Sequence, residues 1–309
     1  MGHADVGNAP TTETDVKTET TISVQDRPEF ENREVGVAKE VDVERKLTLF
    51  ERISNINAVR KMTILLGLIV AWQAYTLIAR PDPLLFPTFT STMDAMWEAL
   101  ADGTLLLKVW ITVKVLLLGY AAGLVAAAVF LVLAVSTRIG RDILSTLTAM
   151  FQPLPAISLL PLAMLWFGLG VPSLVFVTVH SVLWAVALST NMGFMAVSET
   201  QRMVGRNYGL RGVRYIWLIL VPAAFTSILT GLKIGWAFAW RTLIGAELVF
   251  GAASGDGGLG WFIYEKGENL ETPSVFAGLF TVIIVGLIVE NLIFRRIENS
   301  TVNKWGMLR

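Results

Sequence analysis

The side chains best suited to chemistry in this sequence are three ionisable groups within one long apolar stretch: Lys233, Arg241 and Glu247. An ionisable group at the centre of a bilayer costs about 2.5–3.5 kcal/mol on insertion scales, so each needs water or a partner. The planar guanidinium of Arg241 donates paired hydrogen bonds that suit the oxygens of small anions. We therefore expect Arg241 either to line a substrate path or to hold a structural partner, whereas Lys233 snorkels and Glu247 is structural.

A second set of candidate residues consists of prolines, tryptophans and one histidine within the apolar runs. Pro155 and Pro161 lie within one apolar run, and each favours a kink because proline has no backbone N–H. The kink either turns freed carbonyls toward a polar cavity or serves packing alone. We expect the lone His180 to be a satisfied interior group. The candidate substrate-path residues are Arg241, Pro155, Trp166 and Trp240.

Several chemistries are excluded by the residue types that are missing. The sequence has no cysteine and only two histidines, His3 and His180, so we assign no metal ligands and no thiol nucleophile. It contains no Gly-Lys-Ser/Thr phosphate cradle, so ATP is not hydrolysed by such a site on this chain. Ser181 follows His180, but neighbours on a helix do not face each other, which disfavours a membrane-embedded hydrolase. We assign no catalytic residues.

The composition is that of a membrane protein. Of the 309 residues, 54% are hydrophobic and 16% are charged, and the mean hydropathy is +0.59. Soluble domains carry about 25% charged residues, so a typical soluble enzyme, a disordered chain and a nucleic-acid-binding protein are excluded. The acids are concentrated at the start, where residues 1–50 hold 11 acids and 6 bases.

An all-α fold with about six membrane-spanning helices follows from the apolar runs, since a bilayer core needs about 20 apolar residues per helix. By the positive-inside rule, the loops and tail that hold ten bases, including Arg138, Arg206 and Arg296, are cytoplasmic. Both termini then lie in the cytoplasm. The predicted spans are Met62–Ala79, Leu105–Val135, Leu144–Trp166, Leu174–Met195, Ala224–Val249 and Val275–Phe294.

Four segments follow from these patterns. Residues 1–43 form an acidic, disordered tail, because they have no sustained apolar face. Residues 44–61 form either an amphipathic helix on the membrane surface or a simple lead-in to the first span. The transmembrane domain covers 62–296, and 297–309 is a cytoplasmic tail.

Two of the outer loops have recognisable patterns. The stretch Leu84–Gly103 predicts a short amphipathic helix that rests on the outer surface. The glycine-rich stretch Gly251–Pro273 is either a re-entrant or gating element or an ordinary surface loop, because irregular backbone is tolerated at membrane depth only when it is buried or lines a cavity. Within it we take Gly258, Gly260 and Trp261 as a candidate outer gate.

The loop 196–215 between the fourth and fifth spans is basic and polar. Glu199, Met203 and Arg206 share one helical face, and Gly209 permits a sharp turn before a second short helix. Such a helix–turn–helix either presents a compact surface to a partner protein or only fixes the topology. The candidate partner-docking residues are Glu199, Arg202, Met203, Arg206, Gly209, Arg211 and Pro222.

Four ordered motifs resemble one family. They are Gly209 with Pro222-Ala223-Ala224 thirteen residues later, Pro153-Leu154-Pro155-Ala156-Ile157, Gly245-Ala246-Glu247 and Gly257-Gly258-Leu259-Gly260. Together they resemble the permeases of ABC importers, in the nitrate, sulfonate and bicarbonate (taurine-type) branch. The resemblance covers about residues 62–296.

One departure from the family pattern concerns the loop. The family places an acidic residue and two small residues six to four positions before the loop glycine, where this sequence has Met203, Val204 and Gly205. Glu199 lies one helical turn earlier, and we hypothesise that it replaces the missing acid.

The resemblance implies a transport subunit without cofactors of its own. Two ATP-binding subunits would carry ATP and Mg and grip the loop. A second permease copy, or a close relative of this chain, would complete the path, and a periplasmic or lipid-anchored binding protein would deliver the solute. The implied location is the bacterial inner membrane. The alternative is an ion-coupled secondary transporter, although such proteins usually contain internal repeats, which this sequence does not show.

Overall fold

The computed structural model describes residues 57–250 and 257–301, and the predictions for 1–43, most of 44–61, Gly251 and 302–309 lie outside the described residues. The chain divides into two units, Met1–Arg60 and Lys61–Arg309, and the helical bundle belongs to the second. The described residues are mostly helical and contain no strand, which confirms the all-α fold.

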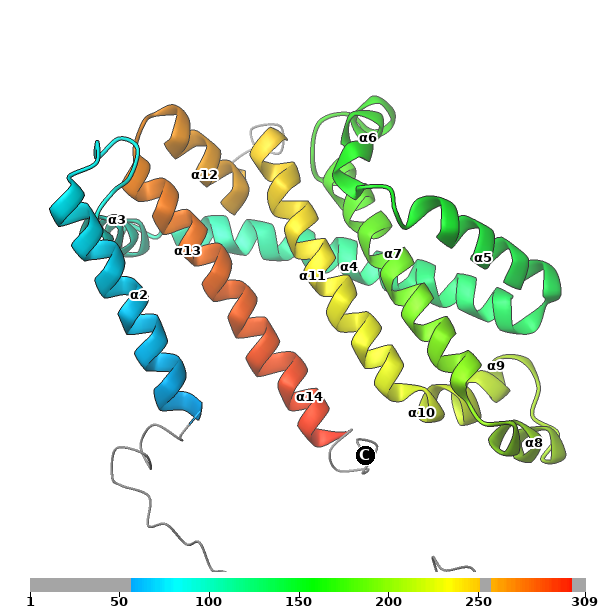
Figure 1. The fold of residues 1–309 in the computed structure, drawn as a ribbon. Helices are drawn as coiled ribbons and strands as arrows, with labels where there is room; N and C mark the ends of the chain where they lie inside the picture. The colour runs from blue at the N-terminus through cyan, green and yellow to red at the C-terminus, as the bar shows by residue number, and fades with distance from the viewer. Residues whose placement is uncertain (1–56, 251–256, 302–309) are drawn as a thin grey trace, which may run out of the picture. The chain divides into compact units, whose positions relative to one another are not determined.

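The helices follow one another with short connections (Figure 1). Their bounds are α2 Asn57–Ala79, α3 Phe89–Ala101, α4 Thr104–Ser136, α5 Arg138–Phe151, η2 Ala156–Leu159, α6 Leu160–Phe167, α7 Val171–Ala196, α8 Glu199–Asn207, α9 Gly212–Tyr215, η3 Ile216–Leu220, α10 Val221–Ala223, α11 Phe225–Phe250, α12 Leu259–Glu268, α13 Thr272–Ile288, η5 Val289–Phe294 and α14 Arg295–Ser300.

The described residues hold four helices long and apolar enough to cross a membrane, or up to six if two bent helix pairs each count as one span. The predicted span Leu144–Trp166 is wrong as a single kinked helix. α5 ends at Phe151, and the axis turns by 93° before η2 and α6. Pro153 and Pro155 cause the break, because neither supplies the N–H that continues the helical hydrogen bonds.

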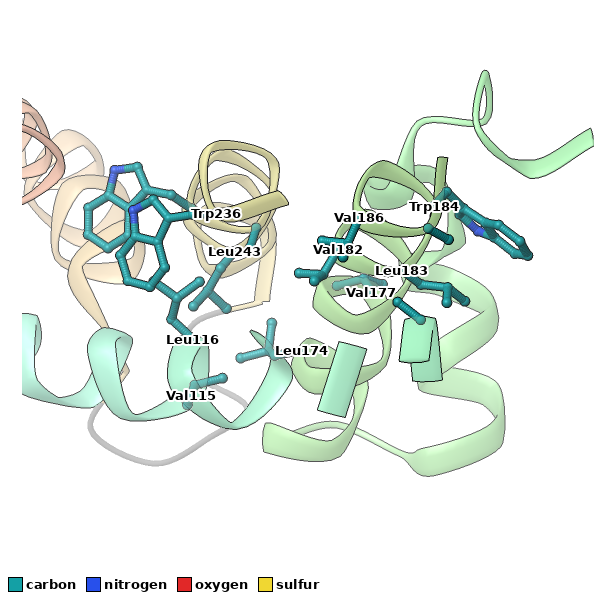
Figure 2. Close-up of a cluster of buried hydrophobic side chains, with 14 of the residues drawn as sticks. Val115, Leu116, Leu174, Val177, Val182, Leu183, Trp184, Val186, Trp236 and Leu243 are labelled. Carbon is teal, nitrogen blue, oxygen red and sulfur yellow. The ribbon is translucent and has the colours of Figure 1, made fainter. Parts of the chain in front are cut away.

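The most extensive packing joins α7 to α4 on one side and to α11 on the other. Figure 2 shows buried side chains of the three helices in one cluster, including Leu116 of α4, Val182 of α7 and Leu243 of α11. Lipid is as apolar as these side chains, so close packing rather than burial from water must hold the helices together.

Glycines make the close approach to α7 possible from both sides. A Cβ on Gly119 of α4 would lie 2.6 Å from the Thr178 side chain, and one on Gly231 of α11 would lie 2.9 Å from Ser189. These are the small residues that the sequence places four apart with Gly123 and Gly235. Small residues at this spacing let two membrane helices approach closely.

A helix is present within the stretch Leu84–Gly103, as predicted. α3 begins after Thr88, whose hydroxyl accepts a hydrogen bond from the backbone N–H of Ser91 and caps the helix. The indole of Trp72 in α2 donates to the carbonyl of Pro87 over 3.0 Å, and its ring contacts Phe280 of α13. Aromatic contacts therefore join α2, the start of α3 and α13.

Candidate functional site

A pocket of about 370 Å³ lies beside the break between α5 and α6, and Arg241 in its wall is an exposed residue. One wall is residues 151–157, from the last residue of α5 to the first residues of η2, and the others belong to α7 and α11. The side chains that define its chemistry are Phe151, Gln152, His180, Trp184, Phe238 and Arg241. The sequence alone places these three segments far apart, and the fold brings them together.

Aromatic rings form one side of this pocket. Phe151 stacks on Trp184 with ring centroids 5.4 Å apart and an angle of 11° between planes. The ring of His180 meets Phe151 edge-on at 6.0 Å and Trp184 at 6.1 Å. Figure 2 shows the Trp184 ring, itself buried, on the opposite side of α7 from Leu243. Aromatic packing thus holds the broken segment against α7.

Arg241 supplies the positive charge of the pocket. Its Nε donates to the carbonyl of Ala237 over 3.1 Å, and its guanidinium lies 5.0 Å from the ring centroid of Phe238. Among the described residues no carboxylate forms an ion pair with it. Its terminal N–H groups are therefore available to an anion.

Two further groups in the pocket wall have unused hydrogen-bonding capacity. Both ring nitrogens of His180 and the indole nitrogen of Trp184 are buried without a partner in the described structure. The expectation that His180 is a satisfied interior group is therefore wrong. Trp184 is a pocket residue that the sequence patterns do not single out, although its position four residues after His180 places both on one helical face.

The remaining substrate-path candidates divide between the pocket and other places. Pro155 lines the pocket together with Arg241. Trp166 is exposed and contacts Phe176 outside the pocket, and Trp240 is buried but does not line it.

The loop between α7 and α11 forms the predicted helix–turn–helix. Gly209 has φ +69° and turns the chain after α8, as its sequence position predicts. Pro222 lies in α10, just before the 85° bend into α11. Figure 1 shows α8, α9 and α10 at the end where α14 also ends, with α6 and α12 at the other end.

The face of α8 that carries Glu199, Met203 and Arg206 is exposed. Glu199 and Arg206 form an ion pair of 3.2 Å, but both side chains are about two-thirds exposed, so the pair contributes little to stability. Arg202 instead turns inward, where its Nε donates to the carbonyl of Val197 over 3.0 Å and closes the end of α7. The exposed face is free to contact another protein.

The packing of the hairpin explains why position 205 holds a glycine. A Cβ on Gly205 would lie 2.9 Å from the side chains of both Tyr215 and Ile219. The glycine lets α8 pack closely on the second arm of the hairpin.

The glycine-rich outer segment is not an ordinary surface loop over residues 258–263. Gly258 and Gly260 are buried at the start of α12, and Trp261 stacks on Tyr264 with centroids 5.2 Å apart. The backbone N–H of Gly260 donates to Glu247 Oε2 over 3.0 Å. A Cβ at Gly258 would overlap the Glu247 carboxylate and the Thr112 hydroxyl, so glycine leaves room for these side chains to reach the start of α12.

A buried hydrogen-bond network extends from this contact. The Thr112 hydroxyl of α4 donates to Glu247 Oε2 over 2.8 Å and accepts from the N–H of Leu259 over 2.7 Å. Glu247 is 1% exposed, as its structural role predicts. The network, which we call the α4–α11–α12 clamp, joins Thr112, Glu247, Leu259 and Gly260.

No group of three or more His, Cys, Asp or Glu residues able to hold a metal ion occurs in the described part of the chain. The described residues form a pocket lined by one arginine, an exposed helical hairpin and a buried clamp. These are features of a transport protein with a partner-docking surface.

Comparison with known proteins identifies the family. Residues 116–300 match the family described as binding-protein-dependent transport system inner membrane component, and the chain belongs to it. It is 27% identical to the taurine transport system permease protein TauC of Escherichia coli over 241 residues, which cover 75% of this chain and 86% of TauC. It is 25% identical to the nitrate import permease protein NrtB of Synechocystis over 255 residues, 81% of this chain and 91% of NrtB.

The chain is therefore a multi-pass membrane permease subunit of an ABC importer, a transport subunit rather than an enzyme. Proteins of this family work with ATP-binding and substrate-binding partners. The membership decides against the secondary transporter and the membrane hydrolase.

Proposed function

We propose that this permease imports a small anion of the nitrate, sulfonate (taurine) or bicarbonate class through the pocket at Arg241. The observation that carries the proposal is the Arg241 guanidinium, which lies on a helix of a candidate membrane span, lines the pocket and forms no ion pair with a carboxylate of the described residues. An unpaired charge at this depth is expensive unless a ligand or water satisfies it. The names of TauC and NrtB, which specify taurine and nitrate, support the anionic class.

The proposed assembly has two copies of this chain, two ATP-binding subunits at the hairpins and one binding protein on the outer face. The hairpin is assigned to the ATPase because its exposed face carries both charge and apolar surface next to a rigid turn. The proposed location is the bacterial inner membrane, with the hairpin and both termini in the cytoplasm, as the distribution of bases favours.

The test is purification of the full chain with its associated proteins, followed by an ATPase assay in lipid with nitrate, taurine and bicarbonate. We expect an ATP-binding subunit to copurify, and its hydrolysis to rise with one of these anions and the matching binding protein. An assembly whose hydrolysis responds only to uncharged solutes contradicts the anionic class and leaves the family membership intact.

A prediction for the hairpin tests whether Glu199 replaces the acidic residue that the family has at the position of Met203. Replacing Glu199 with alanine should lower transport about tenfold, the effect of losing roughly 1.4 kcal/mol of contact with the ATPase. Met203→Ala changes the same exposed face without removing charge and should leave assembly and transport normal. Both variants are compared by uptake and by copurification of the ATPase.

Glu199→Gln keeps the shape of the side chain and separates the charge from the fold of α8. If transport falls in Met203→Ala but persists in both Glu199 variants, the contact with the ATPase lies at Met203, the position where the family has its acidic residue, and not at Glu199.

A further inference from the structure

A second and larger cavity, of about 660 Å³, lies where α4 and α7 end. Its wall combines the end of α4 at Ser136, the end of α7 at Met195 and the turn between α8 and α9 at Leu210. Both α4 and α7 are candidate membrane spans. The cavity therefore lies at the depth where a spanning helix leaves the hydrocarbon region and phospholipid headgroups are found.

The charge of this cavity is entirely positive. Among the described residues, its wall holds four arginines and no aspartate or glutamate. It shares no lining residue with the pocket at Arg241, so it is not part of the proposed substrate path. The four arginines are Arg141, Arg202, Arg206 and Arg211.

Two of these arginines are already engaged by the protein. Arg202 donates to the carbonyls at the end of α7, and Arg206 pairs with Glu199. The side chains of Arg141 and Arg211 form no hydrogen bond or ion pair with any residue in the described ranges. They come from two separate elements, α5 and the start of the second hairpin arm.

A neutral group of the cavity wall is also unpaired. The hydroxyl of Tyr215 is buried and has no hydrogen-bond partner in the described structure. Buried hydroxyls nearly always have a partner, so an unpaired one in a cavity wall indicates a missing ligand or water. Two free guanidinium groups and a hydroxyl are the donors that bind phosphate oxygens.

The surroundings of the cavity suit a lipid tail as well as a phosphate. Met195 lines it and is 70% exposed, and Ile139, on the first turn of α5, is 73% exposed. Acidic headgroups bind basic pockets at the ends of membrane helices. We infer that this cavity binds a phosphate group, either from the headgroup of an anionic phospholipid or from a free phosphate compound.

The test measures phospholipid retained by the purified full-length chain. The chain is exposed to vesicles of phosphatidylglycerol or phosphatidylcholine, and bound lipid is counted by native mass spectrometry. The wild type should retain phosphatidylglycerol and not phosphatidylcholine. Arg141→Ala and Arg211→Ala should each weaken retention about fivefold, because a base near the membrane surface contributes about that factor to binding an acidic lipid.

Matched controls exist on the same two elements. Arg138→Ala and Arg214→Ala remove the same charge from α5 and α9 but do not line the cavity, so retention should stay within about twofold of the wild type. Gel filtration of every variant shows that it remains folded. Because the measurement uses no ATPase and no transport substrate, its result is independent of the proposed function.

A parallel arm identifies the source of the phosphate. If inorganic phosphate raises the melting temperature of the wild type but not of Arg141→Ala, while the two lipids are retained equally, the ligand is a free phosphate compound. Equal loss of phosphatidylglycerol in all four variants, or the absence of any response to lipid and to phosphate, overturns the inference. The second outcome would assign the cavity to an acidic side chain of a partner protein.

Discussion

Replacing Arg241 with alanine is expected to lower anion import by a factor on the order of tenfold to a hundredfold, while the chain still assembles with its partners. The magnitude is that of losing one hydrogen-bonded charge from a binding site. The guanidinium is the cationic group of the pocket wall, and its terminal N–H groups have no described carboxylate to satisfy them. Uptake of nitrate, taurine and bicarbonate by the reconstituted importer measures the effect.

Arg241→Lys distinguishes charge from geometry at this position. Lysine keeps the positive charge but lacks the planar donor fork, so import should fall less than in Arg241→Ala and still remain below wild type. Arg138→Ala, an exposed arginine outside the pocket, should import normally. If Arg241→Ala instead loses its partners or melts at a lower temperature with unchanged uptake per assembled complex, the residue is structural.

The pocket should keep some affinity for polar solutes after Arg241 is neutralised. His180 and Trp184 hold unpaired nitrogens in the same wall, and these can still bond to a solute without the guanidinium. That residual binding is the reason that a complete loss of import is not expected.

Much of the fold was predictable from the sequence because membrane spans are local features. Length and apolar content predict α2, α4, α7 and α13 closely, since a spanning helix satisfies its backbone within one segment. Gly119 and Gly231 are each followed by another glycine four residues later, a spacing that favours close helix contact. The hairpin follows from a polar stretch interrupted by Gly209.

The remainder depends on contacts between distant residues. Thr112 and Glu247 are 135 residues apart, and no periodicity indicates that they meet. The sequence predicts only a kink where the 93° break precedes α6, because the apolar run is continuous through Pro153 and Pro155. Apolar content shows that a run is long enough to span a membrane, but not whether it forms one straight helix or two helices at an angle.

The candidate site shows the same limit. Arg241 and Pro155 are conspicuous in the sequence because each is unusual within an apolar run, and both line the pocket. Trp166 and Trp240 are equally conspicuous, but tryptophan is also a normal packing residue, and neither lines it. The donors at Arg141 and Tyr215 belong to different elements, so only the fold associates them.

Removing the carboxylate of Glu247 is expected to have the largest effect on stability. Glu247→Ala leaves the Gly260 N–H without its acceptor and removes one partner of the Thr112 hydroxyl, all within a buried contact. An unsatisfied buried donor costs about 1–3 kcal/mol, so the total is about 3 kcal/mol. The purified chain should melt at a temperature lower by on the order of 10 °C.

Glu247→Gln tests whether the acceptor or only the filled volume matters. Its amide oxygen can accept one of the two hydrogen bonds in nearly the same space, so its melting temperature should lie between those of the alanine variant and the wild type. A glutamine variant as unstable as alanine would show that the second oxygen is essential. Equal stability of all three proteins would contradict the role of the α4–α11–α12 clamp.

A substitution at Gly258 tests the clamp independently of Glu247. Gly258→Ala adds a Cβ that overlaps the Glu247 carboxylate and the Thr112 hydroxyl, so these side chains or α12 must shift, and we expect this to weaken the same hydrogen bonds without changing any charge. Gly267→Ala is the matched control, because it lies on the same helix and its Cβ meets only Val275 at 3.9 Å. If the clamp holds α12 in place, Gly258→Ala and Glu247→Ala should each be destabilising, and their combination should cost less than the sum of the two, since both break one shared contact.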